Sequence, residues 1–174
     1  NRFVGGLVGY SRALITDCYV TGLVNGTDMV GGLVGYNRGT IADCYATGSV
    51  TGDFYVGGLV AFNNGTLSTC YATSSVTGVA PYVGGLVGEI NVSQITACFW
   101  DIQTSGQATS AGGEGKTTSE MQTLSTFIEA EWDFTNETFN GTNDYWRMCS
   151  NGVDYPRLNW ESTNGDFSCP DGVN

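Results

Sequence analysis

The sequence repeats itself four times with a period close to 26 residues. The copies read FVGGLVGYSRALITDCYVTGLV from Phe3, MVGGLVGYNRGTIADCYATGSV from Met29, YVGGLVAFNNGTLSTCYATSSV from Tyr55 and YVGGLVGEINVSQITACFW from Tyr82. Their leading valines are 26, 26 and 27 residues apart, whereas their cysteines are 26, 26 and 28 apart, so one or two residues are inserted near the last copy. This period is too short for helix-pair repeats and for a propeller blade of about 40 residues.

A period of 26 fits one coil of a β-solenoid. Each copy holds β-rich runs such as GGLVGY, TIADCYATG and SVTG, bounded by Asn, Gly, Thr and Asp. Three short strands and three corners fill the period, and each residue then lies about 4.8 Å from its counterpart in the next coil. The resulting columns are chemically alike: Leu7, Leu33, Leu59 and Leu86; Val24, Val50 and Val76; Tyr19, Tyr45, Tyr71 and Phe99; Ile15, Ile41, Leu67 and Ile95. We therefore predict an all-β fold, a right-handed parallel β-helix of about four coils.

Glycine pairs recur in the same place in every copy. They are Gly5 and Gly6, Gly31 and Gly32, Gly57 and Gly58, and Gly84 and Gly85. We expect them where the coil turns with positive φ or where two backbones come close. A flexible linker is the alternative, but linkers do not repeat an apolar column.

The stretch VGGLVGYNRGTIADCYATGSVTG resembles the GLUG motif, a repeat of bacterial and some archaeal surface proteins that include large adhesins. The likeness covers residues 3 to about 101. A second stretch, CFWDIQTSGQATSAGGEGKTTSEMQTLSTFIEAEWDF, followed by YWRM and GVDYPRL, is similar to the segment that closes such arrays. The resemblance implies an extracellular, non-catalytic stalk or adhesive module, and it brings no catalytic residues with it.

The composition changes after residue 101. We expect three parts: solenoid repeats over 1–101, a polar loop over 102–117 and a capping segment over 118–174. Thr117 and Glu120 have capping-box spacing before an amphipathic pattern, which predicts a short helix over roughly 118–130. Short strands follow, giving a small α/β cap that covers the open end of the coil stack. Its core residues are predicted to be Trp132, Phe134, Trp146 and Leu158.

Charge and composition exclude several functions. The chain has six Lys and Arg against 17 Asp and Glu, a net charge of −11, and only three basic residues in its first hundred positions. A nucleic-acid partner is therefore not expected. No apolar run is long enough to span a bilayer, and there is no histidine to act as a general base or metal ligand. Residues 101–174 carry 12 acids, which we read as a solvated face; calcium held by loop carboxylates is the alternative, and no other cofactor is expected.

The cysteines form two groups. Cys18, Cys44, Cys70 and Cys98 share one repeat column, for which we favour a buried ladder of free thiols. Disulfides between neighbouring rungs, Cys18 with Cys44 and Cys70 with Cys98, are the alternative, although side chains that point the same way fit the bond poorly. Cys149 and Cys169 flank the final strands and are predicted to form a disulfide in an oxidising setting. Paired CxxC spacing, typical of zinc sites, is missing.

Five sequons make the chain a candidate glycoprotein, and their asparagines would have to lie on exposed corners. They start at Asn25, Asn64, Asn91, Asn136 and Asn140.

Catalysis would need clustered carboxylates on one face of the coils. Asp17 and Asp43 are stacked, but their column continues as Thr69 and Ala97, and nearby Arg12 and Arg38 could neutralise them. We therefore predict that the chain is not an enzyme; a polysaccharide-degrading β-helix is the remote alternative. A carbohydrate-binding module, suggested by exposed tyrosines such as Tyr10 and Tyr36, is the closer one.

The ends of the coil stack differ. The first residue already lies in a repeat, so we expect an open coil at one end, exposing Phe3, Val4, Leu7 and Val8. An open strand edge invites pairing, and a head-to-tail contact between copies propagates as a fibre. The prediction is a secreted, cell-surface structural or adhesive protein whose partners are other copies of itself, neighbouring domains, glycans or a host surface.

Overall fold

The computed structural model describes residues 2–79, 81–135 and 141–164. The chain divides into two compact units, Asn1–Thr117 and Thr118–Asn174, which are described one at a time.

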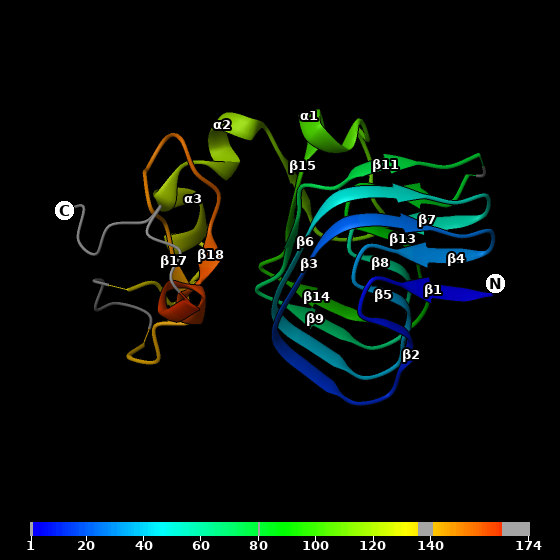
Figure 1. Cartoon of the computed structure of the whole chain (residues 1–174), viewed down its shortest axis with the longest axis horizontal. Coiled ribbons are helices and arrows are strands. Elements are labelled where there is room, and N and C mark those ends of the chain that lie inside the picture. Colours follow the sequence, from blue (N-terminus) through cyan, green and yellow to red (C-terminus); the bar gives the residue numbers. More distant parts are fainter. Residues whose placement is uncertain (1, 80, 136–140, 165–174) are drawn as a thin grey trace. The chain divides into compact units, whose positions relative to one another are not determined.

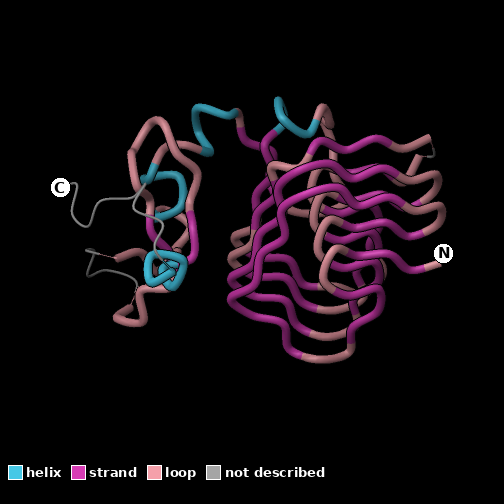
Figure 2. Tube along the Cα trace, in the orientation of Figure 1, coloured by secondary structure: helices cyan, strands magenta, loops and turns pink. Residues whose placement is uncertain are grey.

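The first unit is a β-solenoid built from parallel sheets (Figures 1 and 2). Its strands stack coil on coil, as the repeat predicts. The first coil comprises β1 (Phe3–Gly5), β2 (Val8–Ser11) and β3 (Leu14–Asn25), and the second comprises β4 (Met29–Gly31), β5 (Val34–Asn37) and β6 (Thr40–Thr51). The third coil comprises β7 (Tyr55–Gly57), β8 (Val60–Asn63), β9 (Thr66–Ser68), β10 (Tyr71–Ala72) and β11 (Ser75–Thr77). The fourth comprises β12 (Val83–Gly84), β13 (Val87–Ile90), β14 (Gln94–Thr96) and β15 (Phe99–Asp101).

The strands pair in the register that the repeat predicts. Leu33 lies over its equivalent in the next coil, and Cys18 pairs with Cys44 across β3 and β6. The offset is 26 residues between the first three coils. It becomes 27 where Val83 pairs with Val56, and 28 where Gln94 pairs with Thr66. Both insertions therefore fall between strands, where an extra residue leaves the ladders intact.

The glycine pairs mark places where backbones come close. A Cβ on Gly31 would collide with the Val34 carbonyl oxygen, and one on Gly32 with the carbonyl oxygen of Gly58 in the next coil. Of the two predicted reasons for glycine, close approach is the one found here. Positive φ occurs instead in the column of Asp17, Asp43, Thr69 and Ala97, with φ of 54, 50, 48 and 50°.

Two cores of apolar side chains, each made of several repeat columns, lie inside the solenoid. The larger core contains Leu33, Ile41, Cys44 and their counterparts in the third and fourth coils. A smaller core consists of stacked valines: Val24, Val30, Val50, Val56 and Val76. Because each layer is covered by the next, the side chains of the second and third coils in these columns are almost fully buried.

The segment 102–117, expected to be a polar loop, also closes the stack at the fourth coil. It contains α1 (Ile102–Ser105) and β16 (Glu114–Lys116), which pairs with β15. Ser110 Oγ receives hydrogen bonds from the backbone N–H groups of Leu86 and Val87, at 3.3 and 2.8 Å. Trp100 joins the main core, with Ile102 packed against it. The end of the stack opposite the first coil is thus covered from within the first unit (Figure 1).

The second unit has a small aromatic core of its own. The predicted helix over 118–130 is two helices, and the strands after it are short. The elements are α2 (Thr118–Met121), α3 (Leu124–Ile128), β17 (Trp146–Arg147), β18 (Arg157–Leu158) and the 3-10 helix η1 (Asn159–Asn164). The predicted core residues Trp132, Phe134, Trp146 and Leu158 are all buried, and the Trp132 and Trp146 ring centroids are 4.5 Å apart.

Candidate assembly surface

The first coil leaves part of the main apolar column uncovered. The Leu7 side chain is 46% exposed, whereas its counterparts Leu33, Leu59 and Leu86 are 0% exposed. Val4 and Val8 are half-buried, whereas Val30 and Val34, their partners in the second coil, are fully buried. The predicted assembly-end residues, which also include the half-buried Phe3, therefore lie together on this coil. Their incomplete burial comes from having a neighbouring coil on one side only.

The backbone of the first coil forms an edge in each sheet. In the described part of the chain β1, β2 and β3 each pair with a strand of the second coil and with no other strand. Such edges are templates for pairing with another strand, and proteins usually protect them with charge. At the opposite end β16 has that protection, because Glu114 and Lys116 form an ion pair of 2.7 Å on it. Of the first-coil strands, β1 and β2 hold no charged residue and β3 holds only Asp17.

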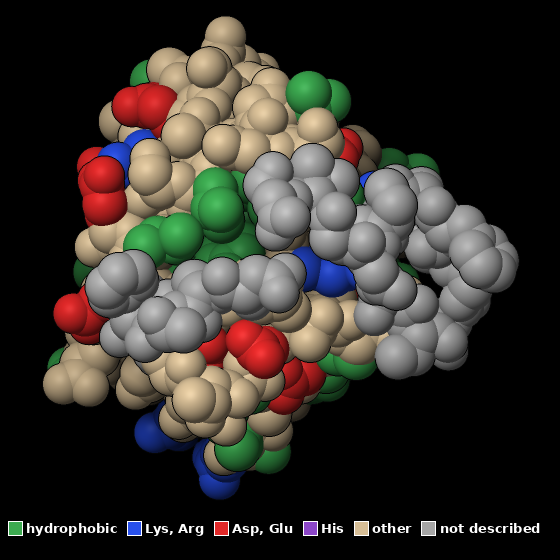
Figure 3. All heavy atoms as spheres, turned by 90° about the vertical axis from the view of Figure 1, so that its left-hand side faces the viewer, with side chains coloured by type: hydrophobic (Ala, Val, Ile, Leu, Met, Phe, Trp, Pro, Cys, Tyr) green, Lys and Arg blue, Asp and Glu red, His purple; other side chains and the backbone are tan. Residues whose placement is uncertain are grey.

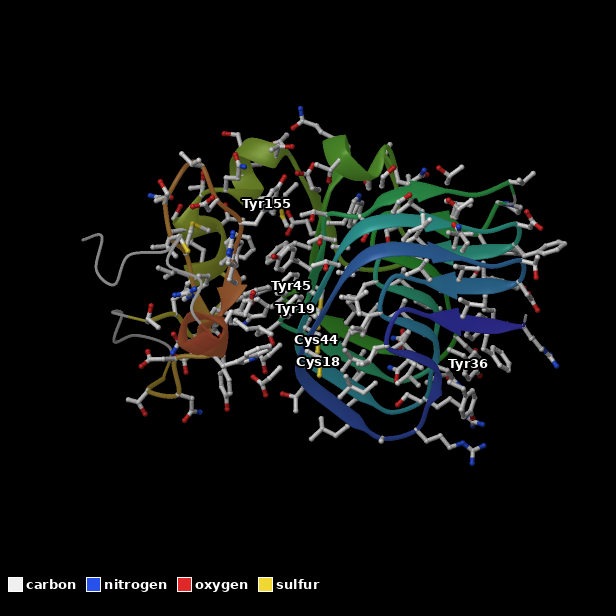
Figure 4. The ribbon with its side chains drawn as sticks, in the orientation of Figure 1. Cys18, Tyr19, Tyr36, Cys44, Tyr45 and Tyr155 are labelled. Atoms are coloured by element: carbon white, nitrogen blue, oxygen red, sulfur yellow. The ribbon has the colours of Figure 1, made fainter. Side chains whose placement is uncertain are left out.

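An aromatic column runs along the outside of the same coils. The rings of Tyr10 and Tyr36 are stacked at 5.2 Å between centroids, and those of Tyr36 and Phe62 at 5.1 Å. Figure 4 places Tyr36 on the side of the solenoid away from Tyr19 and Tyr45. Because each ring covers its neighbour's face, the column presents ring edges to solvent. Sugars pack against ring faces, so this geometry does not favour the predicted carbohydrate-binding role of Tyr10 and Tyr36.

Two arginines accompany this column. Arg12 Nε donates a hydrogen bond of 2.8 Å to the Tyr10 hydroxyl, and its guanidinium carbon lies 5.5 Å from the ring centroid. The pKa of Tyr10 is lowered, first by this hydrogen bond from Arg12 and then by Arg38, while desolvation opposes the shift. The sequence offered Arg12 as a residue that could neutralise Asp17, whereas in the structure its guanidinium contacts the ring and the hydroxyl of Tyr10.

Comparison with known proteins agrees with this repeat geometry. A family model described as the GLUG motif matches residues 4–25 and 26–51, which are the first two coils. These two coils match the GLUG motif. The third and fourth coils continue the same columns in register, so the described solenoid is one GLUG-type stack. No curated protein and no solved structure matched the chain.

The cysteines of the GLUG coils are free thiols in an inward column. Cys18, Cys44, Cys70 and Cys98 each donate a hydrogen bond to the carbonyl two residues earlier, at 3.0–3.1 Å. Figure 4 shows Cys18 and Cys44 one above the other. Burial is the main reason why the pKa of Cys18 is raised and that of Cys70 is raised well above its usual value. These are properties of packed structural thiols rather than reactive ones.

The stacked carboxylates lie where the long strands turn. Asp17 and Asp43 both have positive φ, and each accepts a hydrogen bond from a threonine. Thr16 Oγ1 donates to Asp17 at 2.5 Å, and Thr69 Oγ1 donates to Asp43 at 2.6 Å. Short polar side chains tolerate this left-handed conformation because they hydrogen-bond locally. The geometry therefore gives these carboxylates a role in shaping the turn.

A buried asparagine ladder stabilises another corner, and sequence reasoning missed it. Asn37 Oδ1 accepts from the Gly39 N–H at 3.0 Å, and its Nδ2 donates to Asn63 Oδ1 in the next coil at 2.8 Å. Both asparagines are 0% exposed. The signal was present in the sequence, since the two residues share a repeat position, but asparagine at a corner is usually read as solvent-facing.

The remaining predicted sites divide between described and undescribed residues. Asn25 and Asn91 are exposed and Asn64 is half-buried, whereas Asn136 and Asn140 lie outside the described residues. Cys149 is buried and Cys169 lies outside the described residues, so their disulfide stays a prediction. Within residues 2–79, 81–135 and 141–164, no group of three or more His, Cys, Asp or Glu could hold a metal ion. The helices of that part are too short or too polar to cross a membrane.

Proposed function

We propose that the chain is a non-catalytic structural and adhesive module of an extracellular surface protein. The observation that carries the proposal is the contrast between the two ends of the GLUG-type stack. The first coil presents a largely apolar edge whose strands hold one charged residue, Asp17, while the fourth coil is covered by residues 102–116. A repeat protein built in this way works through its shape and its ends.

The first coil is suited to receive another β-strand or coil. Its strands have unpaired edges in the described part of the chain, and Leu7 is only half covered. A further coil would complete both the ladders and the apolar column, as the second coil does for the third. Completing the burial of Leu7 alone contributes roughly 1 kcal/mol, from half of a leucine side chain. Head-to-tail association of copies would use this edge once in each molecule.

The non-catalytic part of the proposal is supported by the chemistry of the coils. Histidine is missing from the sequence, and the stacked Asp17 and Asp43 are engaged by threonine hydroxyls in a turn. The thiols point into the core and donate hydrogen bonds to backbone carbonyls. Burial raises the pKa of Cys18 and of Cys70. None of these groups is arranged as a nucleophile with a neighbouring base.

The experiment compares two leucine-to-lysine variants of the first coil by sedimentation velocity and negative-stain electron microscopy. Leu7→Lys places a charge in the open column, whereas Leu23→Lys changes a side chain that is already 68% exposed and whose column continues as Ser49 and Ser75. We expect the wild type and Leu23→Lys to associate and Leu7→Lys to stay monomeric. Monomeric wild-type protein at about 100 µM, a concentration at which even weak contacts assemble, would refute the assembly role.

A further inference from the structure

Arg12 and Arg38 occupy equivalent positions on neighbouring coils. The residues before them, Ser11 and Asn37, pair in register, and the Arg38 N–H donates to the Ser11 carbonyl at 2.8 Å. Both arginine side chains are exposed, on rungs about 4.8 Å apart. Like charges at such neighbouring positions repel each other and are destabilising. An anion that bridges the two guanidinium groups would remove this cost.

The described part of the chain supplies no such anion. Arg2 pairs with Asp28 and Lys116 with Glu114, whereas neither Arg12 nor Arg38 forms an ion pair with a described residue. Arg12 lies over the Tyr10 ring and donates to its hydroxyl, so the stack of Tyr10 and Tyr36 holds this arginine in place. A guanidinium fixed in this way is suited to bind a carboxylate through two parallel hydrogen bonds.

Most of the negative charge that could face the two arginines lies in the second unit of the chain. Residues 1–117 contain four basic and seven acidic residues, a net charge of −3, whereas residues 118–174 contain two basic and ten acidic residues, a net charge of −8; together these make −11. Figure 3 shows acidic side chains at several places on one face of the molecule. In the described part of the second unit, Glu129 and Glu131 are exposed and form no ion pair. They follow each other closely at the end of α3.

We propose that Arg12 and Arg38 bind Glu129 and Glu131 of a second copy of this chain. This inference rests on the proposed function, because it names the partner surface for association at the first coil. The contact is heterologous, joining the first coil of one molecule to the second unit of the next, so each molecule can use both surfaces at once in a ring or a filament. Exposed apolar side chains also occur in both units, Leu7 at 46% in the first coil and Trp160 at 42% in the second unit.

The test is sedimentation equilibrium of the full chain at 50 mM and 500 mM NaCl. Arg12→Gln with Arg38→Gln should weaken self-association about tenfold at low salt, the effect expected from losing two partly exposed ion pairs. At high salt the difference from wild type should shrink because the pairs are screened. Glu129→Gln with Glu131→Gln should reproduce both effects. Asp53→Asn, which removes an exposed carboxylate from the solenoid, should change neither.

Charge-reversed variants test whether the two arginines and the two glutamates contact each other. Arg12→Glu with Arg38→Glu and Glu129→Arg with Glu131→Arg should each associate poorly alone and recover when mixed. If the arginine variants associate like wild type while Leu7→Lys remains monomeric, the inference is wrong and the proposed function stands. If wild type does not associate at either salt concentration, both are wrong. Monomers that bind an anionic polysaccharide through Arg12 and Arg38 would also overturn the choice of a second copy as partner.

Discussion

The same substitution along one leucine column should have very different costs. Leu33 is 0% exposed between two coils, so Leu33→Ala opens a cavity in a packed core and should lower the free energy of unfolding by about 3–5 kcal/mol. Leu7 is 46% exposed and has no coil beyond it in the described chain. Leu7→Ala loses about half of a leucine transfer free energy and leaves no enclosed cavity, a cost of roughly 1 kcal/mol.

The assay is urea denaturation in dilute solution, with hydrogen–deuterium exchange on peptides from residues 1–117 to report on the first unit. Leu59→Ala serves as a replicate, because Leu59 has the same burial and the same position in the third coil. Equal costs for Leu7→Ala and Leu33→Ala in the monomer would show that the first coil is covered, and would refute the reasoning about an open edge. At higher protein concentration the cost of Leu7→Ala should rise, because association then buries this side chain.

Three further predictions concern other columns of the stack. Gly32→Ala should lower the free energy of unfolding by about 2–3 kcal/mol, because the new Cβ would collide with the Gly58 carbonyl. In the control Gly106→Ala the new Cβ meets open space, so the loss should be only the roughly 1 kcal/mol that a left-handed backbone costs an alanine. Urea denaturation measures both. Burial raises the pKa of Cys70, so the folded chain keeps a thiol proton that the unfolded chain releases above the usual thiol pKa of 9.0. The free energy of unfolding, measured in reductant, should therefore fall as the pH rises above 9.0. Cys18, the least buried thiol of the column, should be the first of the four to react with Ellman's reagent. If the native host glycosylates the chain, mass spectrometry should find glycans on the exposed Asn25 and Asn91 before the half-buried Asn64. A flat pH profile, or preferential modification of Asn64, would contradict the last two.

The repeat made the solenoid predictable because side chains that stack on each other in neighbouring coils must be chemically compatible. Leu7 and Leu33 can be alike for many reasons, but four leucines spaced 26, 26 and 27 residues apart are explained by stacking. The insertions followed from the same logic: the offset grows from 26 to 28, and the structure places the extra residues between strands. The glycine pairs were predicted with two alternatives, and only coordinates could separate close approach from positive φ.

Features that depend on side-chain direction were not predictable in the same way. Asn37 and Asn63 were visible as a repeated pair, yet their burial depends on the corner folding inward so that the amides bond to each other. The placement of Arg12 against Tyr10 depends on the outward alternation of β2, and the sequence alone left it equally close to Asp17. The closure of the fourth coil by residues 102–117 had no periodic signal, since the return to β15 takes 15 residues instead of 26.

The two ends of the stack differ because a repeat specifies its interior and not its boundaries. Every interior rung has a neighbour on each side, so one sequence pattern satisfies all of them, and a boundary needs residues outside that pattern. At the fourth coil these are Ser110, Trp100 and the charged β16. The first coil has no such closing residues in the described chain, and it carries Arg2 and Arg12, which are basic in a chain of net charge −11. A boundary that is largely apolar, with Asp17 as the one charged residue of its strands, and that carries arginines beside those strands favours an acidic, strand-bearing neighbour over solvent.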